Sequence, residues 1–378
     1  MVKKILISLI FVMLFMTPAY SSDALIPYTD YKDEYDTFIE NIPEEIAEIL
    51  PKEVYSGDSD EIAELTKTLS NPESFFDILL KMLGFGIKDA LGMFAALMAL
   101  VLLSAMARNI FSGSDGIKEP YSFCISAATA LAIVGGQTEL IKMAGGFISR
   151  LLALVNSMLP LVGVLYAAGG NVSTAASGTT SLGFFISVCE NLCGLTLMPV
   201  VGICLAFSLA SSFSGNSSLS EISGVFKRIY TYGLGLFAAI MALVMGMQNQ
   251  LTAKADSLGA RAAKYAVGQF IPVLGNTVGE NLRTAAASIE YIRGSVGGLA
   301  IVVILLLLLP TLISLILGKT AVSVSSSAAK MLGCDKEGKL LSDICSIYGY
   351  IIAVCSICSL LFIYALTLFV RCSSALGG

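Results

Sequence analysis

Seven long stretches of the chain are apolar, and each is free of charged residues. A helix needs roughly 20 residues to cross the ~30 Å hydrocarbon core of a bilayer, and these stretches are close to that length or longer. They are Ala90–Ala107, Pro120–Thr138, Leu151–Cys189, Asn191–Ser220, Ile229–Ala253, Ser295–Gly318 and Ser346–Val370. The pattern predicts an all-α, polytopic membrane protein.

The third stretch is too long for a single crossing and must contain a turn. Turn-forming residues gather between Gly169 and Ser181, which leaves helices near 151–168 and 182–210. Seven spans follow. An eighth candidate, 262–282, contains polar and charged residues and either crosses, lies in the interface or re-enters. Lysine and arginine are nearly balanced between the two sets of loops, so the side of the C-terminus stays open.

The N-terminal part divides into two segments. Residues 1–21 have the pattern of a secretory signal peptide, with two lysines, a short apolar run Ile5–Met16 and small residues before the expected cleavage point. An uncleaved anchor is the alternative. Residues 22–86 are acidic, because sixteen of the 28 acidic residues lie between positions 23 and 77. Apolar residues at helical spacing predict short amphipathic helices in this exported segment.

Two parts of the chain share an ordered set of short elements. Leu159–Gly163 is followed by Thr174–Ser177, and Ile271–Gly275 is followed by Thr284–Ser288. After each come an apolar helix, a serine-rich stretch, an acid–isoleucine pair, an isoleucine–tyrosine pair and another apolar helix. Chance matches among common membrane residues are the alternative. The shared order predicts an internal duplication, inverted if each copy crosses three times.

The expected organisation is therefore a signal peptide and an acidic segment, a first helix pair at 87–144, a repeat at 145–254 and a second repeat at 255–378.

The two Pro-x-x-Gly elements are candidate pathway residues. Proline removes a backbone N–H and glycine permits a bend, so each helix is expected to be interrupted and to leave polar backbone facing protein or water. The residues are Pro160 and Gly163 in the first copy, and Gln269, Pro272 and Gly275 in the second. Two kinked helices with a purely structural role are the alternative.

Glu190 is a second kind of candidate, because it is an acid within an otherwise apolar region. Charge inside a membrane is costly, and an intramembrane carboxylate suggests a function by default. It could carry a proton if burial raised its pKa. A structural place near a helix end, or in a hydrogen bond with Asn191, is the alternative.

Composition argues against most chemistry. The chain is 56% hydrophobic and 13% charged, and it has no histidine and no tryptophan, which removes the commonest general base and zinc ligand. Cys355 and Cys358 have redox-like spacing inside an apolar helix, where cysteine packs as a small residue. We expect no enzyme activity, no metal, no cofactor and no nucleic-acid partner.

The signal sequence, the acidic exported segment, the duplicated elements and the stretch Gln269–Gly275, followed by Gly279 and Thr284–Ser288, together resemble the stage III sporulation protein AE family of endospore-forming bacteria. The resemblance covers essentially the whole mature chain. The family has no established catalytic residues to carry over.

The resemblance implies a multi-pass subunit of the channel or secretion apparatus in the mother cell membrane around the forespore. The implied partners are the other stage III sporulation membrane proteins, a ring-forming component and a cytosolic ATPase. The alternative function is a secondary transporter that moves a small solute through an inverted-repeat helical core past Glu190.

Overall fold

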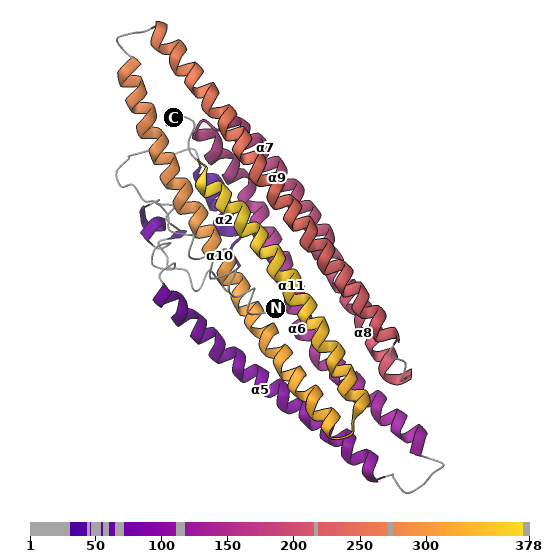
Figure 1. The fold of residues 1–378 in the computed structure, drawn as a ribbon. Coiled ribbons are helices and arrows are strands. Elements are labelled where there is room, and N and C mark those ends of the chain that lie inside the picture. The colour runs from indigo at the N-terminus through magenta and orange to yellow at the C-terminus, as the bar shows by residue number, and fades with distance from the viewer. Residues whose placement is uncertain are drawn as a thin grey trace.

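The computed structural model describes residues 31–43, 46, 54–55, 60–64, 72–110, 118–214, 218–270 and 275–372. The predicted signal peptide lies outside these residues. Regular structure in the described part is helical (Figure 1). The elements are α2 (Lys32–Glu40), α5 (Pro72–Ile110), α6 (Lys118–Ala168), α7 (Val172–Cys189), the π-helical η2 (Glu190–Leu195), α8 (Leu197–Ser214), α9 (Ser218–Phe270), α10 (Gly275–Met331) and α11 (Asp335–Arg371). The prediction of an all-α membrane protein is confirmed.

Six helical segments of the described residues are long and apolar enough to cross a membrane, close to the seven or eight expected. They are Gly86–Ala107, Phe123–Ala168, Val172–Phe213, Leu219–Ala262, Ala286–Met331 and Asp335–Arg371. The difference arises partly in α6, which joins the stretches expected to form two spans into one helix of 51 residues. The eighth candidate forms no span of its own, because 262–270 continues α9 and α10 begins at Gly275.

Long helices run up and down the molecule as an elongated bundle with two ends (Figure 1). One end holds the turn between α6 and α7, and we call it the α6–α7 end. The other holds the turn between α10 and α11, and we call it the α10–α11 end. Each turn contains a glycine in the left-handed region, Gly170 with φ 78° and Gly333 with φ 74°, which other residues adopt only with strain. The turn expected between Gly169 and Ser181 is confirmed only at its beginning, because α7 already starts at Val172; the helix start expected near 182 is wrong.

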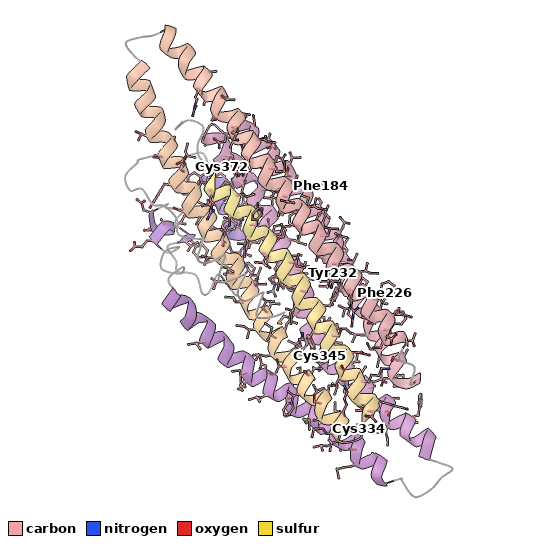
Figure 2. All side chains as sticks on the ribbon, in the orientation of Figure 1. Phe184, Phe226, Tyr232, Cys334, Cys345 and Cys372 are labelled. Atoms are coloured by element: carbon pink, nitrogen blue, oxygen red, sulfur yellow. The ribbon has the colours of Figure 1, made fainter. Side chains whose placement is uncertain are left out.

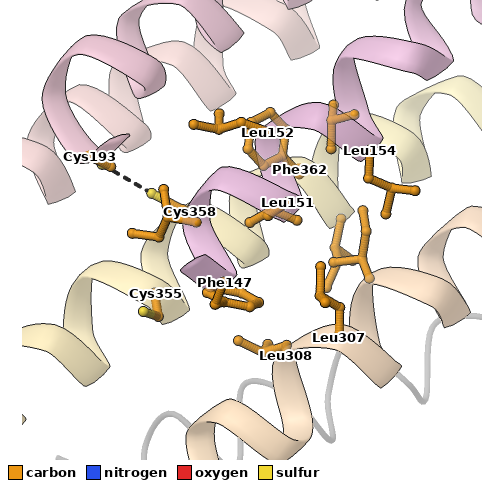
Figure 3. Packing of buried hydrophobic residues seen from close by; sticks show 14 of the residues in the cluster. Phe147, Leu151, Leu152, Leu154, Cys193, Leu307, Leu308, Cys355, Cys358 and Phe362 are labelled. Atoms are coloured by element: carbon orange, nitrogen blue, oxygen red, sulfur yellow. Dashed lines mark hydrogen bonds between the residues drawn. The ribbon is translucent and has the colours of Figure 1, made fainter. Parts of the chain in front are cut away.

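Helices α10 and α11 form the centre of the core and pack against each other along most of their length. Gly297 of α10 lets α11 pack closely against α10, because it has no side chain. A Cβ at this position would collide with Cγ2 of Val370 and lie 3.1 Å from Cδ1 of Phe369. Helix α5 packs on the outer side of α10, and α6 and α9 pack against α11. Figure 3 shows how aromatic and aliphatic side chains of α6, α10 and α11 fill the space between them.

The described N-terminal part packs onto the bundle. Tyr35 and Phe38 of α2 are fully buried within the common hydrophobic core, and α2 contacts α6. The hydroxyl of Tyr35 donates a hydrogen bond of 2.7 Å to the carbonyl of Val54. Helix α2 therefore has an apolar side that anchors it to the membrane helices.

Helices α9 and α11, which belong to the two expected copies, run in the same direction. Three hydrogen bonds join them, from Ser220 to Asp343, from the Lys227 ammonium to Ser346, and from Asn249 to the carbonyl of Leu368. The residue numbers increase in the same direction on both helices, so the helices are parallel. These segments of the expected copies are therefore not inverted relative to each other. The inverted arrangement required 262–282 to span or to form a broken helix, and in the described residues this part is the end of α9 and the beginning of α10.

Candidate functional site

The acid Asp256 of α9 caps the beginning of α7 at the α6–α7 end. Its carboxylate accepts hydrogen bonds from the backbone N–H groups of Ser173 and Thr174, both at 2.9 Å, and from the Thr174 hydroxyl at 2.7 Å. The residue that precedes α7, Asn171, makes no capping hydrogen bond with its side chain. The first N–H groups of a helix have no partner within the helix and carry partial positive charge, so a carboxylate from another helix satisfies and stabilises them.

A cleft with several polar side chains lies beside this cap, between α6, α7, α9 and α11. It has a volume of about 460 Å³ including its open mouth. Ser181 of α7 donates a 2.5 Å hydrogen bond to Oε1 of Gln248 on α9, which holds the two walls together. The polar lining residues are Thr174, Ser177, Ser181, Gln248, Asn249 and Thr252, and Tyr166 and Phe369 are among the apolar ones. The enclosed part of this cleft has room for ordered water, which its polar side chains can bind.

The guanidinium of Arg293 lies behind one wall of the cleft. Arg293 is completely buried, and its three side-chain nitrogens have no hydrogen-bond partner. Its Cζ lies 5.5 Å from the ring centre of Tyr166, in position for a cation–π contact. A buried cation without hydrogen bonds is unfavourable, so this side chain is a weak point in the packing.

A separate polar contact lies at the α10–α11 end. Glu337, in the first turn of α11, is buried and accepts hydrogen bonds from Ser104 of α5 at 2.9 Å and Ser126 of α6 at 3.2 Å. One carboxylate thus joins three helices. This arrangement is structural, since its donors are held in the packed interior.

The first Pro-x-x-Gly element is not a break in a helix. Pro160 lies inside α6, which continues to Ala168, and its side chain is exposed. Gly163 packs against α7, where an added Cβ would lie 3.2 Å from Cγ2 of Thr179. Gly163 thus lets α6 and α7 pack closely, whereas the interrupted helix expected at Pro160 is wrong. A proline inside a helix frees one carbonyl but need not end the helix when packing supports both sides.

The second Pro-x-x-Gly element lies at the connection between α9 and α10. Gln269 is in the last turn of α9 and Gly275 begins α10, whereas Pro272 falls outside the described residues.

Glu190 and Asn191 begin the π-helical segment η2, and both are exposed on the outside of the bundle. The Asn191 amide donates to the carbonyl of Ser187 at 2.7 Å. Neither residue lines the cleft. The sequence-based candidates are therefore spread over three places.

Sequence reasoning missed Asp256, Arg293 and Gln248, which the structure brings to the α6–α7 end. Asp256 follows an uncharged stretch by a few residues and Arg293 precedes another. Charges so placed are ordinary at the ends of membrane helices, and only the fold shows that these two are buried.

Seven of the nine cysteines are buried in the packed interior. All nine are free, and Sγ of Cys193 lies 3.2 Å from Sγ of Cys358 (Figure 3). Among the described residues, no three cysteine or acidic side chains are placed to bind a metal ion together.

The long apolar helices and their common core define a helical integral membrane protein. The family model described as stage III sporulation protein AE matches residues 60–373, and the chain belongs to that family. A protein of Bacillus subtilis (strain 168), named stage III sporulation protein AE, is 23% identical over 280 residues, which cover 74% of this chain and 70% of that protein. No solved structure matches. The resemblance inferred from the sequence is confirmed.

Proposed function

We propose that this sporulation-family membrane protein is a non-enzymatic subunit of the channel or secretion apparatus that connects the mother cell and the forespore. The family match over residues 60–373 carries the proposal. It sits in the mother cell membrane around the forespore, with the acidic segment exported. Its partners are the other stage III sporulation membrane proteins, including a ring-forming component, and a cytosolic ATPase that supplies energy.

Helix α2 supports this role, because its two sides have different characters. Tyr35 and Phe38 are buried against the bundle, whereas Asp33, Asp36 and Glu40 are exposed. The apolar side holds the helix in place and leaves an acidic surface available to a basic partner. We assign this surface to docking within the apparatus.

The test reverses the charge of the three exposed acids, Asp33→Lys, Asp36→Lys and Glu40→Lys, in the full-length chain. Sporulation should fall at least tenfold while the amount of protein in the membrane and its stability in detergent stay at wild-type values, because the buried side is untouched. The control reverses exposed Asp335 at the α10–α11 end and should sporulate normally. Normal sporulation of the triple variant would contradict docking through α2.

The second candidate function is a secondary transporter, which the polar cleft favours. A proton-coupled carrier that uses Glu190 should lose activity on Glu190→Gln, whereas a subunit of an assembly should tolerate it. Two observations weaken the carrier: Glu190 does not line the cleft, and α9 and α11 are parallel rather than inverted. Solute flux through the purified chain in liposomes would favour the carrier over the subunit.

A further inference from the structure

Glu190 lies at the middle depth of the apolar part of the bundle. The uncharged stretch Ser346–Val370 of α11 crosses the core, and Cys358 is its central residue. Sγ of Cys193 in η2 lies 3.2 Å from Sγ of Cys358. Since Glu190 precedes Cys193 by less than one helical turn, a bilayer centred on this stretch has Glu190 near its midplane.

The Glu190 side chain points away from the core at that depth. Cys189 and Cys193 are buried on the inner side of the same helix, whereas Glu190 is exposed. The exposed stripe that contains it also includes Phe184 and Leu195, which are 60% and 66% exposed. Figure 2 shows Phe184 on the outside of the bundle. The Glu190 carboxylate makes no hydrogen bond or ion pair with any described residue, whereas its backbone N–H donates to the carbonyls of Ile186 and Ser187.

A carboxylate at the midplane on an outward face is a costly group to leave in lipid. Side chains near helix ends can extend to the interface, but a short acid at mid-depth has no such escape. The helix is also π-helical at this point, from Glu190 to Leu195, and π-helical turns are frequent at functional sites. The stripe is therefore better explained as a protein interface than as a lipid-facing surface.

We propose that this stripe, Phe184 to Leu195, binds a membrane-spanning helix of another protein that carries a lysine or arginine opposite Glu190. The inference rests on the proposed function, because it requires a multisubunit assembly. A basic side chain complements the unpaired acid and removes the cost of leaving it in lipid.

A second copy of this chain does not supply that complement through the same stripe or through α9. A two-fold contact through the stripe would place Glu190 against Glu190. At a similar depth, α9 presents exposed Leu236, Ile240 and Leu243, which offer no charge. The depth of α9 follows from contacts of Tyr230 with Tyr350 and of Gly246 with Tyr364.

The test places a photo-crosslinking amino acid at Leu195 in the full-length chain in sporulating cells. Leu236, equally exposed at a similar depth on α9, is the matched control position. We expect an adduct from position 195, and not from 236, with a different membrane protein, joined at an apolar segment that has a lysine or arginine within one turn. Lipid adducts only, or an adduct with a second copy, would overturn the proposal.

Charge substitution then identifies the contact. Glu190→Lys should reduce the adduct more than about tenfold and Glu190→Gln only a few-fold, because glutamine keeps a hydrogen bond across the interface. Changing the partner's basic residue to glutamate should restore the adduct of Glu190→Lys. An adduct that is unaffected by Glu190→Lys, or that is not restored by the reversal, would refute the pairing.

The control measurements separate this proposal from the proposed function. Because the Glu190 carboxylate has no partner within the described chain, all Glu190 variants should unfold in detergent at the wild-type temperature. If position 195 yields only lipid adducts while the α2 charge reversal still blocks sporulation, the docking stripe is refuted and the subunit role stands. If sporulation does not depend on the chain at all, the proposed function fails first.

Discussion

Replacement of Asp256 tests whether the α6–α7 end is held by a cap supplied from another helix. Asp256→Ala removes the acceptor of three hydrogen bonds and leaves the N–H groups of Ser173 and Thr174 without a partner. Loss of a helix cap costs about 0.5–2 kcal/mol, and a hydrogen bond to a charged group is worth about 1.5–3 kcal/mol. Both ranges count the same hydrogen bonds in part, so they are not simply added. We expect a loss of about 2–4 kcal/mol in the free energy of unfolding.

Asparagine at position 256 has nearly the same shape as aspartate but no charge, so it separates the effect of the carboxylate charge from the effect of side-chain shape. Asp256→Asn keeps one acceptor oxygen but turns an NH₂ group toward a backbone N–H, so about half of the loss should remain. Exposed Glu221 on the same helix provides the matched control, and Glu221→Ala should have the stability of the wild type.

The cysteines provide the assay, since the chain has no tryptophan. Seven of the nine are buried, and Cys124 is exposed. In a Cys124→Ser background, a thiol-reactive fluorescent dye reports unfolding in detergent as the core opens. A titration of mixed micelles with a denaturing detergent gives the free energy. If Asp256→Ala and the wild type unfold at the same point, α7 does not depend on this cap.

Three further substitutions can be measured in the same way. Gly297→Ala should lower the free energy of unfolding by about 1–3 kcal/mol through overpacking, whereas Gly294→Ala on the same helix, with open space at its Cβ position, should be neutral. Arg293→Met should be neutral or stabilising, because it removes a buried cation without hydrogen bonds. Ser104→Ala should cost about 1 kcal/mol by removing a donor to Glu337. A destabilised Gly294→Ala, a destabilised Arg293→Met or an unchanged Ser104→Ala would each contradict the corresponding packing.

Much of the helical architecture could be predicted because lipid-spanning helices leave a strong local signal. The turn at Gly169 and Gly170 was recognisable as well, since a left-handed backbone conformation favours glycine. The continuity of α6 was not predictable. Its polar middle resembles a loop between two spans, but Gln137 is buried and accepts a 2.7 Å hydrogen bond from Tyr348 of α11. A partner more than 200 positions away satisfies the polar group, and no local pattern shows it.

The candidate site escaped prediction for the same reason. Asp256 reads locally as the charge at the end of a membrane helix, yet it binds residues of α7 more than 80 positions earlier. Glu190 shows the converse, since its apolar surroundings indicated its depth in the membrane and only the fold shows that its side chain points outward. Hydropathy gives the depth of a residue along a helix, but only packing gives the direction in which its side chain points.

The buried part of the bundle is taller than the hydrocarbon core of a bilayer. Glu337 and Phe369 mark the two ends of the buried part of α11, which at 1.5 Å per residue are about 48 Å apart. A hydrocarbon core of ~30 Å does not cover that distance. Helix α5 contacts α11 at Glu337, and its nearby Leu103 and Met106 are more than 60% exposed. A bilayer centred on Cys358 leaves these side chains beyond the hydrocarbon core, so exposed apolar surface continues past the depth that the lipid tails reach.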